Sequence, residues 1–228
     1  MVRHRQASAT EPRVGDTHRG SLPPLPGSGR LLSDDRVMTD PPMELGTFER
    51  LAASRRSSLR VDPQAPVPSD LVERLCQVAA WAPSHKKTWP WRFAVFTGGG
   101  RSRLGNAIAD ALDPATFDKP EKIDKFRVKY LRAPTMLVVG SVAGRSAIRT
   151  VENRDATAAA VQTLLLGATA VGLASFWSSS IPDADAAVAE LCGWEPATAT
   201  VAVIYLGWPI EEVAVPQRPP VVISRRDR

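Results

Sequence analysis

The chain has 228 residues, of which 43% are hydrophobic and 23% are charged, a composition that supports one sizeable hydrophobic core. Its net charge of +5 is unevenly distributed. Residues 217–228 carry four arginines and one acid, whereas residues 44–216 carry nineteen basic and eighteen acidic residues. Because the basic excess belongs largely to a tail, it does not indicate a basic face for nucleic acid.

Residues 1–43 contain repeated prolines and glycines and few apolar residues, so we expect this segment to be disordered. The first thirty residues contain five arginines and lack the apolar run of a signal peptide, which favours a cytoplasmic location. Residues 156–177 carry no charge. Their Ala-, Gly- and Thr-rich composition favours a buried helix over a membrane span, and we expect no association with membranes.

The two cysteines, Cys76 and Cys192, lie far apart and form no CxxC pair. Both fall in helical patterns, so buried thiols in a reducing compartment are favoured over a metal or redox role. Two of the three histidines lie in residues 1–43. The sequence therefore offers no metal-ligand cluster and no Ser–His–Asp set, and we predict no metal site.

Hydrophobic spacing predicts the element order α-α-β-α-α-β-α-β-α-β, which indicates an α+β or α/β layered domain. A helix is expected from Glu44, and another from Ser69, a candidate N-cap. The later helices are expected at 101–112, from about 121, at 152–172 and between Pro182 and Gly193. The strands are expected after Pro90 and at 136–142, 174–180 and 198–207.

The stretch WAPSHKKTWPWRFAVF, residues 81–96, joins the second helix to the first strand. Pro83 ends the helix and Pro90 precedes the strand. Polar and cationic side chains lie between them, beside the aromatic Trp81 and Trp89. A loop of this kind suits an aromatic, anionic cofactor, although an ordinary connection with solvated lysines has the same pattern.

A second cationic cluster, SRRSSLR at residues 54–60, follows the first helix. Guanidinium groups and serine hydroxyls bind phosphate oxygens through charge-assisted hydrogen bonds. Solvated surface charge is the alternative interpretation. The glycines at 98–100 do not form a phosphate loop, since GGGRSRLG lacks the Lys-Ser/Thr pair of a P-loop.

Five motifs occur in order and with consistent spacing: SRRS, APSHKKTWPWRF, a strand led by RAP, an Ala-rich helix followed by GLASFW, and AVIYLGWP. Over about residues 44–213 the chain therefore resembles the nitroreductase-like FMN-dependent flavoproteins, most closely the small YdjA-type NAD(P)H nitroreductases. The resemblance implies an α+β three-layer sandwich, with a mixed four- to five-stranded sheet flanked by helices and a long central helix. It also implies a homodimer that shares FMN between its subunits, and it leaves residues 1–43 and a basic tail, 214–228, outside the domain.

The resemblance assigns roles to individual residues. The FMN phosphate and ribityl chain would be held by Arg55, Arg56 and Ser57, with Arg218 as the nearest candidate for a C-terminal phosphate contact. The turn beside the isoalloxazine ring corresponds to Trp177, Ser178 and Ser179, with Trp81 as a further candidate. The loop that reaches the flavin from the second subunit corresponds to Ser84, His85, Lys86 and Lys87.

The implied activity is ping-pong oxidoreduction, in which NADH or NADPH delivers a hydride to flavin N5 and a nitroaromatic, quinone or similar small-molecule acceptor then takes it. Lys86 or Lys87 is expected near N1 and the C2 carbonyl, where a cation stabilises negative charge. His85 is expected to donate a hydrogen bond rather than act as a general acid. The alternatives are a flavin-binding protein without turnover and a nucleic-acid-associated protein that uses its basic tails.

Overall fold

The structure is a computed structural model that describes residues 43–226. The predicted segment 1–43 lies outside the described residues except for Met43. The elements follow the predicted order, with short 3₁₀ turns between some of them. The helices are α1 (Leu45–Ser54), α2 (Ser69–Ala79), α3 (Gly100–Asp110), α4 (Ile123–Lys129), α5 (Ala147–Ala170) and α6 (Asp185–Leu191), and the strands are β1 (Trp91–Thr97), β2 (Thr135–Ser141), β3 (Ala174–Ser178) and β4 (Ala199–Gly207).

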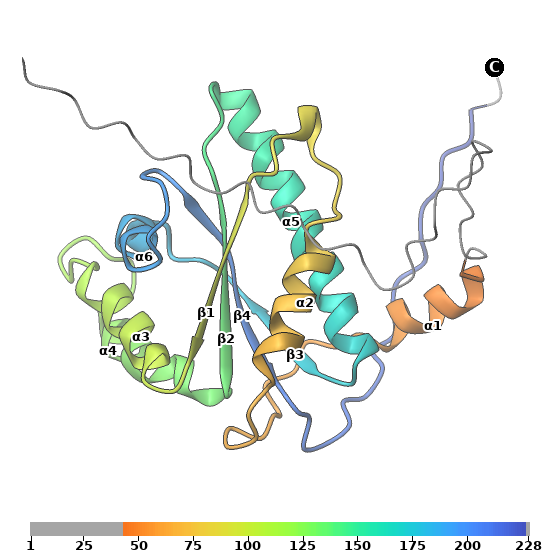
Figure 1. Cartoon of the computed structure of the whole chain (residues 1–228), viewed down its shortest axis with the longest axis horizontal. Helices are drawn as coiled ribbons and strands as arrows, with labels where there is room; N and C mark the ends of the chain where they lie inside the picture. Colours follow the sequence, from red (N-terminus) through yellow and green to blue (C-terminus); the bar gives the residue numbers. More distant parts are fainter. Residues whose placement is uncertain (1–42, 227–228) are drawn as a thin grey trace, which may run out of the picture. The chain divides into compact units, whose positions relative to one another are not determined.

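The four strands form one sheet in the order β1-β2-β4-β3 (Figure 1). The predicted α+β class and four strands are thereby confirmed, but neighbouring strands pair antiparallel throughout, not as a mixed sheet. The reason is the position of β4. Strands β2 and β3 run in the same direction, but β4 lies between them, so they never pair. A single parallel bridge, between Ser57 and Ser175, joins the segment after α1 to β3.

Two hydrophobic clusters cover the two faces of the sheet. On one face α2 and α5 pack against Leu137, Val139 and Ile204. On the other face α3, α4 and α6 pack against Met136, Val138 and Tyr205, so the sheet lies between two helical layers (Figure 1). Successive side chains of a strand point to opposite faces, which explains why β2 is buried along its whole length, as the apolar run predicted.

Helix α5 begins five residues earlier than predicted, at Ala147. Ser146 is its N-cap and accepts a hydrogen bond from the N–H of Arg149 at 3.4 Å. The apolar band used for the prediction starts later, because Ile148 and Val151 in the first turns are exposed and the charged stretch 152–155 follows them. At α2 the predicted N-cap was wrong by one position: Ser69 is the first helical residue, Pro68 is the N-cap, and no side chain caps the helix.

Both cysteines are partly buried and neither forms a disulfide. Burial raises the pKa of each thiol to about 12, and Glu73 adds to this effect at Cys76. Both side chains pack against the hydrophobic clusters, so they serve as small apolar residues rather than as reactive thiolates. Between residues 43 and 226, no helix is both long enough and apolar enough to span a membrane.

Gly105 allows close packing of α3 on α4. A Cβ at this position would lie 2.5 Å from the carbonyl oxygen of Phe126 and 2.8 Å from that of Arg127. Because these obstacles are backbone atoms, we expect Gly105→Ala to lower the free energy of unfolding by about 1–3 kcal/mol. Urea denaturation measures the change.

Gly46→Ala is the matched control, because Gly46 lies in α1 and the nearest atom to its added Cβ, Arg50 Nη1, is 3.6 Å away. It should leave stability unchanged or raise it by about 1 kcal/mol. Equal stabilities of the two variants would contradict the packing argument.

Candidate functional site

The loop between α2 and β1 has an unusual backbone. Lys86, Lys87 and Trp89 have φ values of 52°, 55° and 43°, in the left-handed region that residues other than glycine rarely adopt. Each such residue costs about 1–3 kcal/mol and persists only where the surrounding structure holds it. Strained residues of this kind gather at functional sites, which supports the functional interpretation of this loop over an ordinary connection.

A chain of hydrogen bonds holds the loop to α5. The N–H of Trp89 donates to Ser84 Oγ at 3.1 Å, and Ser84 Oγ lies 2.8 Å from Thr88 Oγ1. Thr88 in turn donates to Asn153 Oδ1 at 2.9 Å, and Asn153 Nδ2 donates to the carbonyl of Val142 at 3.0 Å. The buried Asn153 therefore connects the loop, the end of β2 and α5.

Asn153 was missed by the sequence analysis. It stands in the charged stretch Glu152–Asp155, which reads as a solvated helix face. The signal that could have found it is helical spacing, since Asn153 lies three and seven residues before the buried Ala156 and Ala160.

Ser84 and His85 line a cavity of about 480 Å³ beside α5. Its other walls are Pro83 and four residues of α5: Glu152, Asp155, Ala156 and Ala159. Lys86 does not line this cavity. It lines a different one on the β1 side of the loop, so the structure separates Lys86 from its two predicted companions.

A second cavity, of about 410 Å³, lies between the end of α1, the end of α5 and the segment after β4. Arg56 lines it, and its Nη1 donates to the carbonyl of Arg55 at 2.8 Å. The Nε and Nη2 atoms of Arg56 are buried and have no partner within the described chain. Buried, unpaired donors of a charged group are costly, so this guanidinium fits an anionic ligand.

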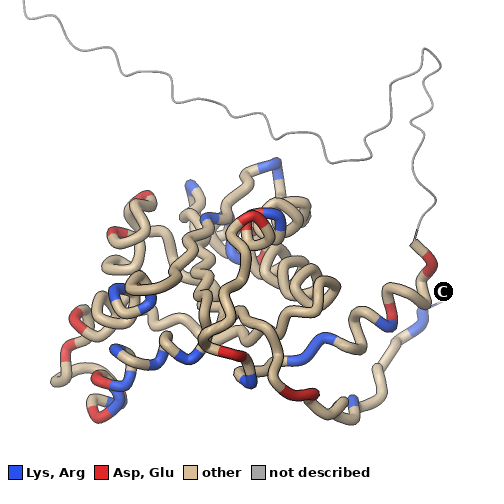
Figure 2. Tube along the Cα trace, turned by 60° about the horizontal axis from the view of Figure 1, so that its bottom comes forward, with Lys and Arg blue, Asp and Glu red and all other residues tan. Residues whose placement is uncertain are grey.

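Acidic side chains partly neutralise the positive charge around the Arg56 cavity. Glu211 and Glu212 line the Arg56 cavity and also the adjoining one, which contains Ser57, Arg60 and Arg132. Figure 2 shows acidic residues of the segment after β4 near the basic end of α1. Glu211 forms an ion pair with Arg60 at 3.1 Å, which leaves Arg56 and Arg132 available to an anion.

Strand β3 lies next to this basic segment, because the N–H of Ser58 donates to the carbonyl of Ser175 at 2.9 Å. At the far end of β3, Trp177 is 37% exposed and its Nε1 donates to the carbonyl of Val201. The buried Ser178 accepts a hydrogen bond from Lys129 Nζ at 3.3 Å, whereas Ser179 is exposed. Burial, together with the charge of Arg132, lowers the pKa of Lys129. No local sequence pattern distinguishes this lysine from its charged neighbours.

Within one chain the predicted site residues form two separate groups. The loop group contacts α5 near Asp155 and the Arg56 group contacts it at Thr169. Fourteen residues of helix, at 1.5 Å each, place these positions about 20 Å apart. Of the twelve predicted residues, only Arg56, Ser84 and His85 line these two cavities. Ser57 lines the adjoining cavity and Lys86 the one on the β1 side of the loop. The other seven line none of the cavities described: Lys87, Trp177, Ser178, Ser179, the 71% exposed Trp81, the half-buried Arg55 at the end of α1, and Arg218 in the extended segment after β4.

A sequence profile of the Nitroreductase family matches residues 52–208. The chain belongs to this family. Among relatives of known name, it is 30% identical to the "Putative NAD(P)H nitroreductase YfhC" of Bacillus subtilis, over 76% of this chain and 88% of that protein. It is 29% identical to the "Putative NAD(P)H nitroreductase YdjA" of Escherichia coli K12, over 70% of this chain and 86% of that protein. The predicted family is thereby confirmed.

The nitroreductase fold is also found in solved structures that resemble this one. The crystal structure of the FMN-dependent nitroreductase NfnB from Mycobacterium smegmatis in complex with NADPH matches with a TM-score of 0.62. The sequences are 21% identical, and the match covers 80% of this chain and all of the other. At this identity the likeness establishes the fold of the nitroreductase chain described here.

Asn153→Ala tests the attachment of the loop in this nitroreductase. The substitution leaves the hydroxyl of Thr88 and the carbonyl of Val142 without their partner, so we expect a loss of about 1–3 kcal/mol of stability. Protease cleavage within residues 84–90 should also become faster, because the side-chain hydrogen bond that ties the strained turn to α5 is lost. The exposed Arg154→Ala on the same helix serves as the control. Unchanged cleavage in Asn153→Ala would show that the loop is held by other contacts.

Proposed function

We propose that this nitroreductase is an FMN-dependent NAD(P)H oxidoreductase that passes a hydride to a small-molecule acceptor such as a nitroaromatic or a quinone. The observation that carries the proposal is the half-buried Arg56, which lines a cavity and whose buried Nε and Nη2 atoms have no partner within residues 43–226. Support also comes from relatives named as NAD(P)H nitroreductases and from NfnB, which is described as FMN-dependent.

In this proposal the segment after α1 holds the anionic end of the cofactor. Arg56 donates to the phosphate, and Arg55 and Ser57 complete the contact with the phosphate and ribityl chain. Charge-assisted bonds from planar guanidinium groups suit phosphate oxygens. Arg218 is a further phosphate contact that requires the extended segment after β4 to fold back or to reach a second copy.

When FMN is bound, Trp177, Ser178 and Ser179 at the end of β3 would hold its ring. FMN, when bound, supplies the hydride acceptance and donation. The chain orients the ring and stabilises negative charge on it. Because Lys86 lines another cavity, we assign the stabilising cation near N1 and the C2 carbonyl to Lys87. Proton transfer to the acceptor is assigned to solvent.

A second copy of the chain completes the site. Ser84 and His85 lie about 20 Å along α5 from the Arg56 cavity, so one chain does not bring both groups to one ring. Two copies related by a two-fold axis, with antiparallel α5 helices, would place the loop of one beside Arg56 of the other. The residues of α5 from Ala156 to Ala170 carry no charge, as the core of such an interface requires.

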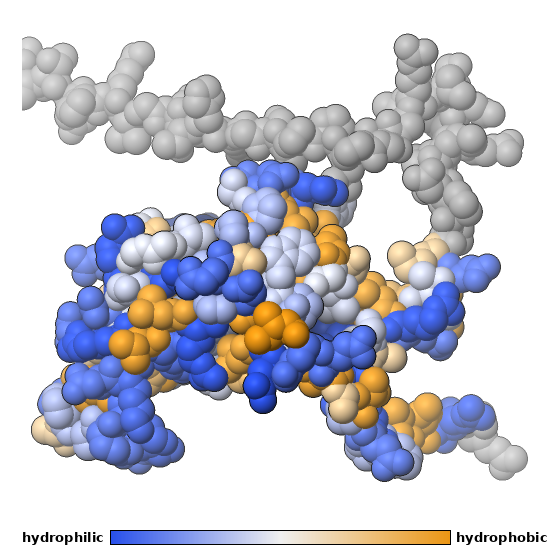
Figure 3. Space-filling view, turned by 90° about the horizontal axis from the view of Figure 1, so that it is seen from below, coloured by the Kyte–Doolittle hydropathy of each residue, from blue (hydrophilic) through white to orange (hydrophobic). Residues whose placement is uncertain are grey.

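Two further segments, α1 and the segment after β4, expose apolar side chains that no other part of one described chain covers. Helix α1 buries none of its residues, and its Leu45 and Phe48 are 69% and 46% exposed. The segment after β4 exposes several large apolar side chains, and Figure 3 shows hydrophobic atoms along its projecting end. Those residues are Val215, Val221, Val222 and Ile223, at 72–92% exposure. A homodimer interface would cover such surface.

Arg56→Ala tests the phosphate assignment. We expect the purified variant to lose FMN on dialysis, at least about tenfold more readily than the wild type, because a charge-assisted bond to phosphate is removed. Visible absorbance measures the flavin content. The control is Arg50→Ala, since Arg50 is an exposed residue of α1 that bonds Thr47. Equal flavin retention in both variants would show that Arg56 does not hold the phosphate.

The wild type also distinguishes turnover from sequestration. Anaerobic NADH or NADPH should bleach the bound flavin, and a quinone should restore its colour. A flavin-loaded protein that is not bleached by either nucleotide would instead be a flavin-binding protein without turnover. A colourless protein that does not take up FMN would contradict the cofactor assignment itself.

Mixing two inactive variants tests the shared site. Arg56→Ala damages one half of each site and a Ser84→Ala/His85→Ala double variant damages the other. If each site uses one half from each copy, a mixed dimer contains one intact site. Random reassociation should then restore flavin binding to about a quarter of the wild-type value. No recovery, in dimers shown to have exchanged subunits, would mean that both halves act within one chain.

A further inference from the structure

A cavity that the proposed flavin site does not use lies on the β1 side of the loop between α2 and β1. Its volume is about 640 Å³. One wall is the loop itself, and the other is the segment that leads from β2 into α5, at the end of the sheet where this loop meets the start of α5 (Figure 1). Among the residues that line it, the charged ones are all basic: Lys86, Arg92, Arg145 and Arg149.

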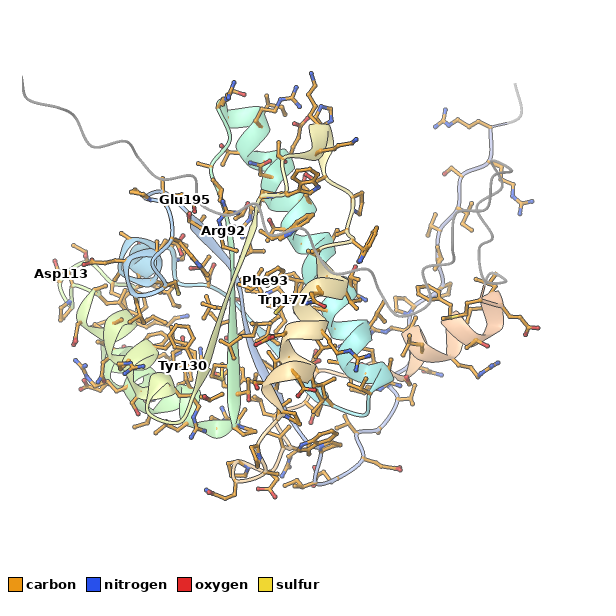
Figure 4. The ribbon with its side chains drawn as sticks, viewed as in Figure 1. Arg92, Phe93, Asp113, Tyr130, Trp177 and Glu195 are labelled. Atoms are coloured by element: carbon orange, nitrogen blue, oxygen red, sulfur yellow. The ribbon has the colours of Figure 1, made fainter. Side chains whose placement is uncertain are left out.

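Two of the four cations are already neutralised. Arg92 Nε donates to Glu195 Oε2 at 3.0 Å, and Figure 4 shows the two side chains together at one end of the sheet. Arg149 Nη1 lies 2.6 Å from Glu152 Oε2. Lys86 and Arg145 form no ion pair and no side-chain hydrogen bond within residues 43–226. The cavity therefore retains two uncompensated positive charges, which suit a doubly charged anion such as a phosphate monoester.

The backbone around Arg145 is held in place before any ligand arrives. A Cβ on Gly144 would lie 2.5 Å from the backbone carbon of Arg149, so this segment lies directly on the first turns of α5. The N–H of Gly144 also donates to Thr150 Oγ1 at 3.0 Å. Rigid presentation of a charged group reduces the entropy lost on binding.

An aromatic surface lies beside these charges. Trp89 lines the cavity, is 61% exposed, and has its backbone in the left-handed region. The surrounding hydrogen bonds hold this strained residue, and its large apolar ring is left accessible. An exposed indole next to a phosphate-sized positive site matches a ligand that joins a planar heterocycle to phosphate.

We propose that this cavity binds the phosphorylated adenosine end of the reductant, with the 2′-phosphate on Arg145 and Lys86 and the adenine against Trp89, so that NADPH is preferred over NADH. The proposal rests on the proposed function, which requires a nicotinamide dinucleotide. Ser84 and His85 line the cavity of about 480 Å³ beside α5, whereas Lys86 lines this one. In the proposed dimer, the flavin would meet the loop on its Ser84 and His85 side, and the adenosine phosphate would bind on its Lys86 side.

Adenosine 2′,5′-bisphosphate is the probe, with 5′-AMP as the comparison, and isothermal titration calorimetry on the flavin-loaded protein is the measurement. We expect the bisphosphate to bind at least about tenfold more tightly, and Arg145→Ala to remove about tenfold of that affinity. The same variant should raise the KM for NADPH by about tenfold and leave kcat and the KM for NADH unchanged. The control is Arg154→Ala, since Arg154 is an exposed residue of α5 outside the cavity.

The outcomes separate this inference from the proposed function. If both nucleotides bleach the flavin but the two adenosine phosphates bind equally, or Arg145→Ala changes neither affinity nor KM, the cavity does not read the 2′-phosphate and the inference is wrong. If inorganic phosphate competes as well as the bisphosphate, adenosine is not the ligand. If no flavin is bound or bleached, the proposed function fails, and titration of the bisphosphate still measures the cavity directly.

Discussion

The architecture depends on the close packing of α5 against the sheet. The helix turns small residues inward, and Ala160 and Ala168 are fully buried against β2 and β4. Gly167 lets Leu75 of α2 approach to 3.0 Å from the position of an added Cβ. Because small side chains bring the helix axis near the sheet, α5 fixes both neighbours at once: the strained loop at its N-terminal half and the Arg56 segment at its C-terminal end. The length of α5 therefore sets the distance between the strained loop and the Arg56 segment.

Much of the fold could be predicted from the sequence because local hydrophobic patterns determine where each helix and strand lies. The apolar run of β2 predicts a strand buried on both faces, and the order of elements follows from the alternation of periods 2 and 3.6. Strand direction could not be predicted in this way. The insertion of β4 between β2 and β3 is decided by pairing across the whole chain, and no local pattern records it.

The residues of the candidate site also differ in how far the sequence indicates them. The run of arginines and serines around Arg56 stands out locally, and the structure gives this residue buried donors without a partner in residues 43–226, although its role in binding FMN stays a prediction. Asn153 and Lys129 could not be predicted, because their importance comes from contacts with residues 65 and 49 positions away, Thr88 and Ser178. The separation of Lys86 from Ser84 and His85 could not be predicted from the sequence either. It arises because adjacent residues in a turn with positive φ point to different sides of the loop.

The central place of β4 has a consequence for how the protein is made. Among the strands of residues 43–226 it is the last to leave the ribosome, yet it is the neighbour through which β3 joins the sheet. Until residue 207 emerges, β3 lacks that neighbour, and the Arg56 segment, which is tied to Ser175, lacks a fixed support. Long-range pairing of this kind is slow to form. The growing chain therefore fixes the position of the Arg56 segment only after residue 207 has left the ribosome, with exposed apolar strands that a chaperone would recognise in the interval.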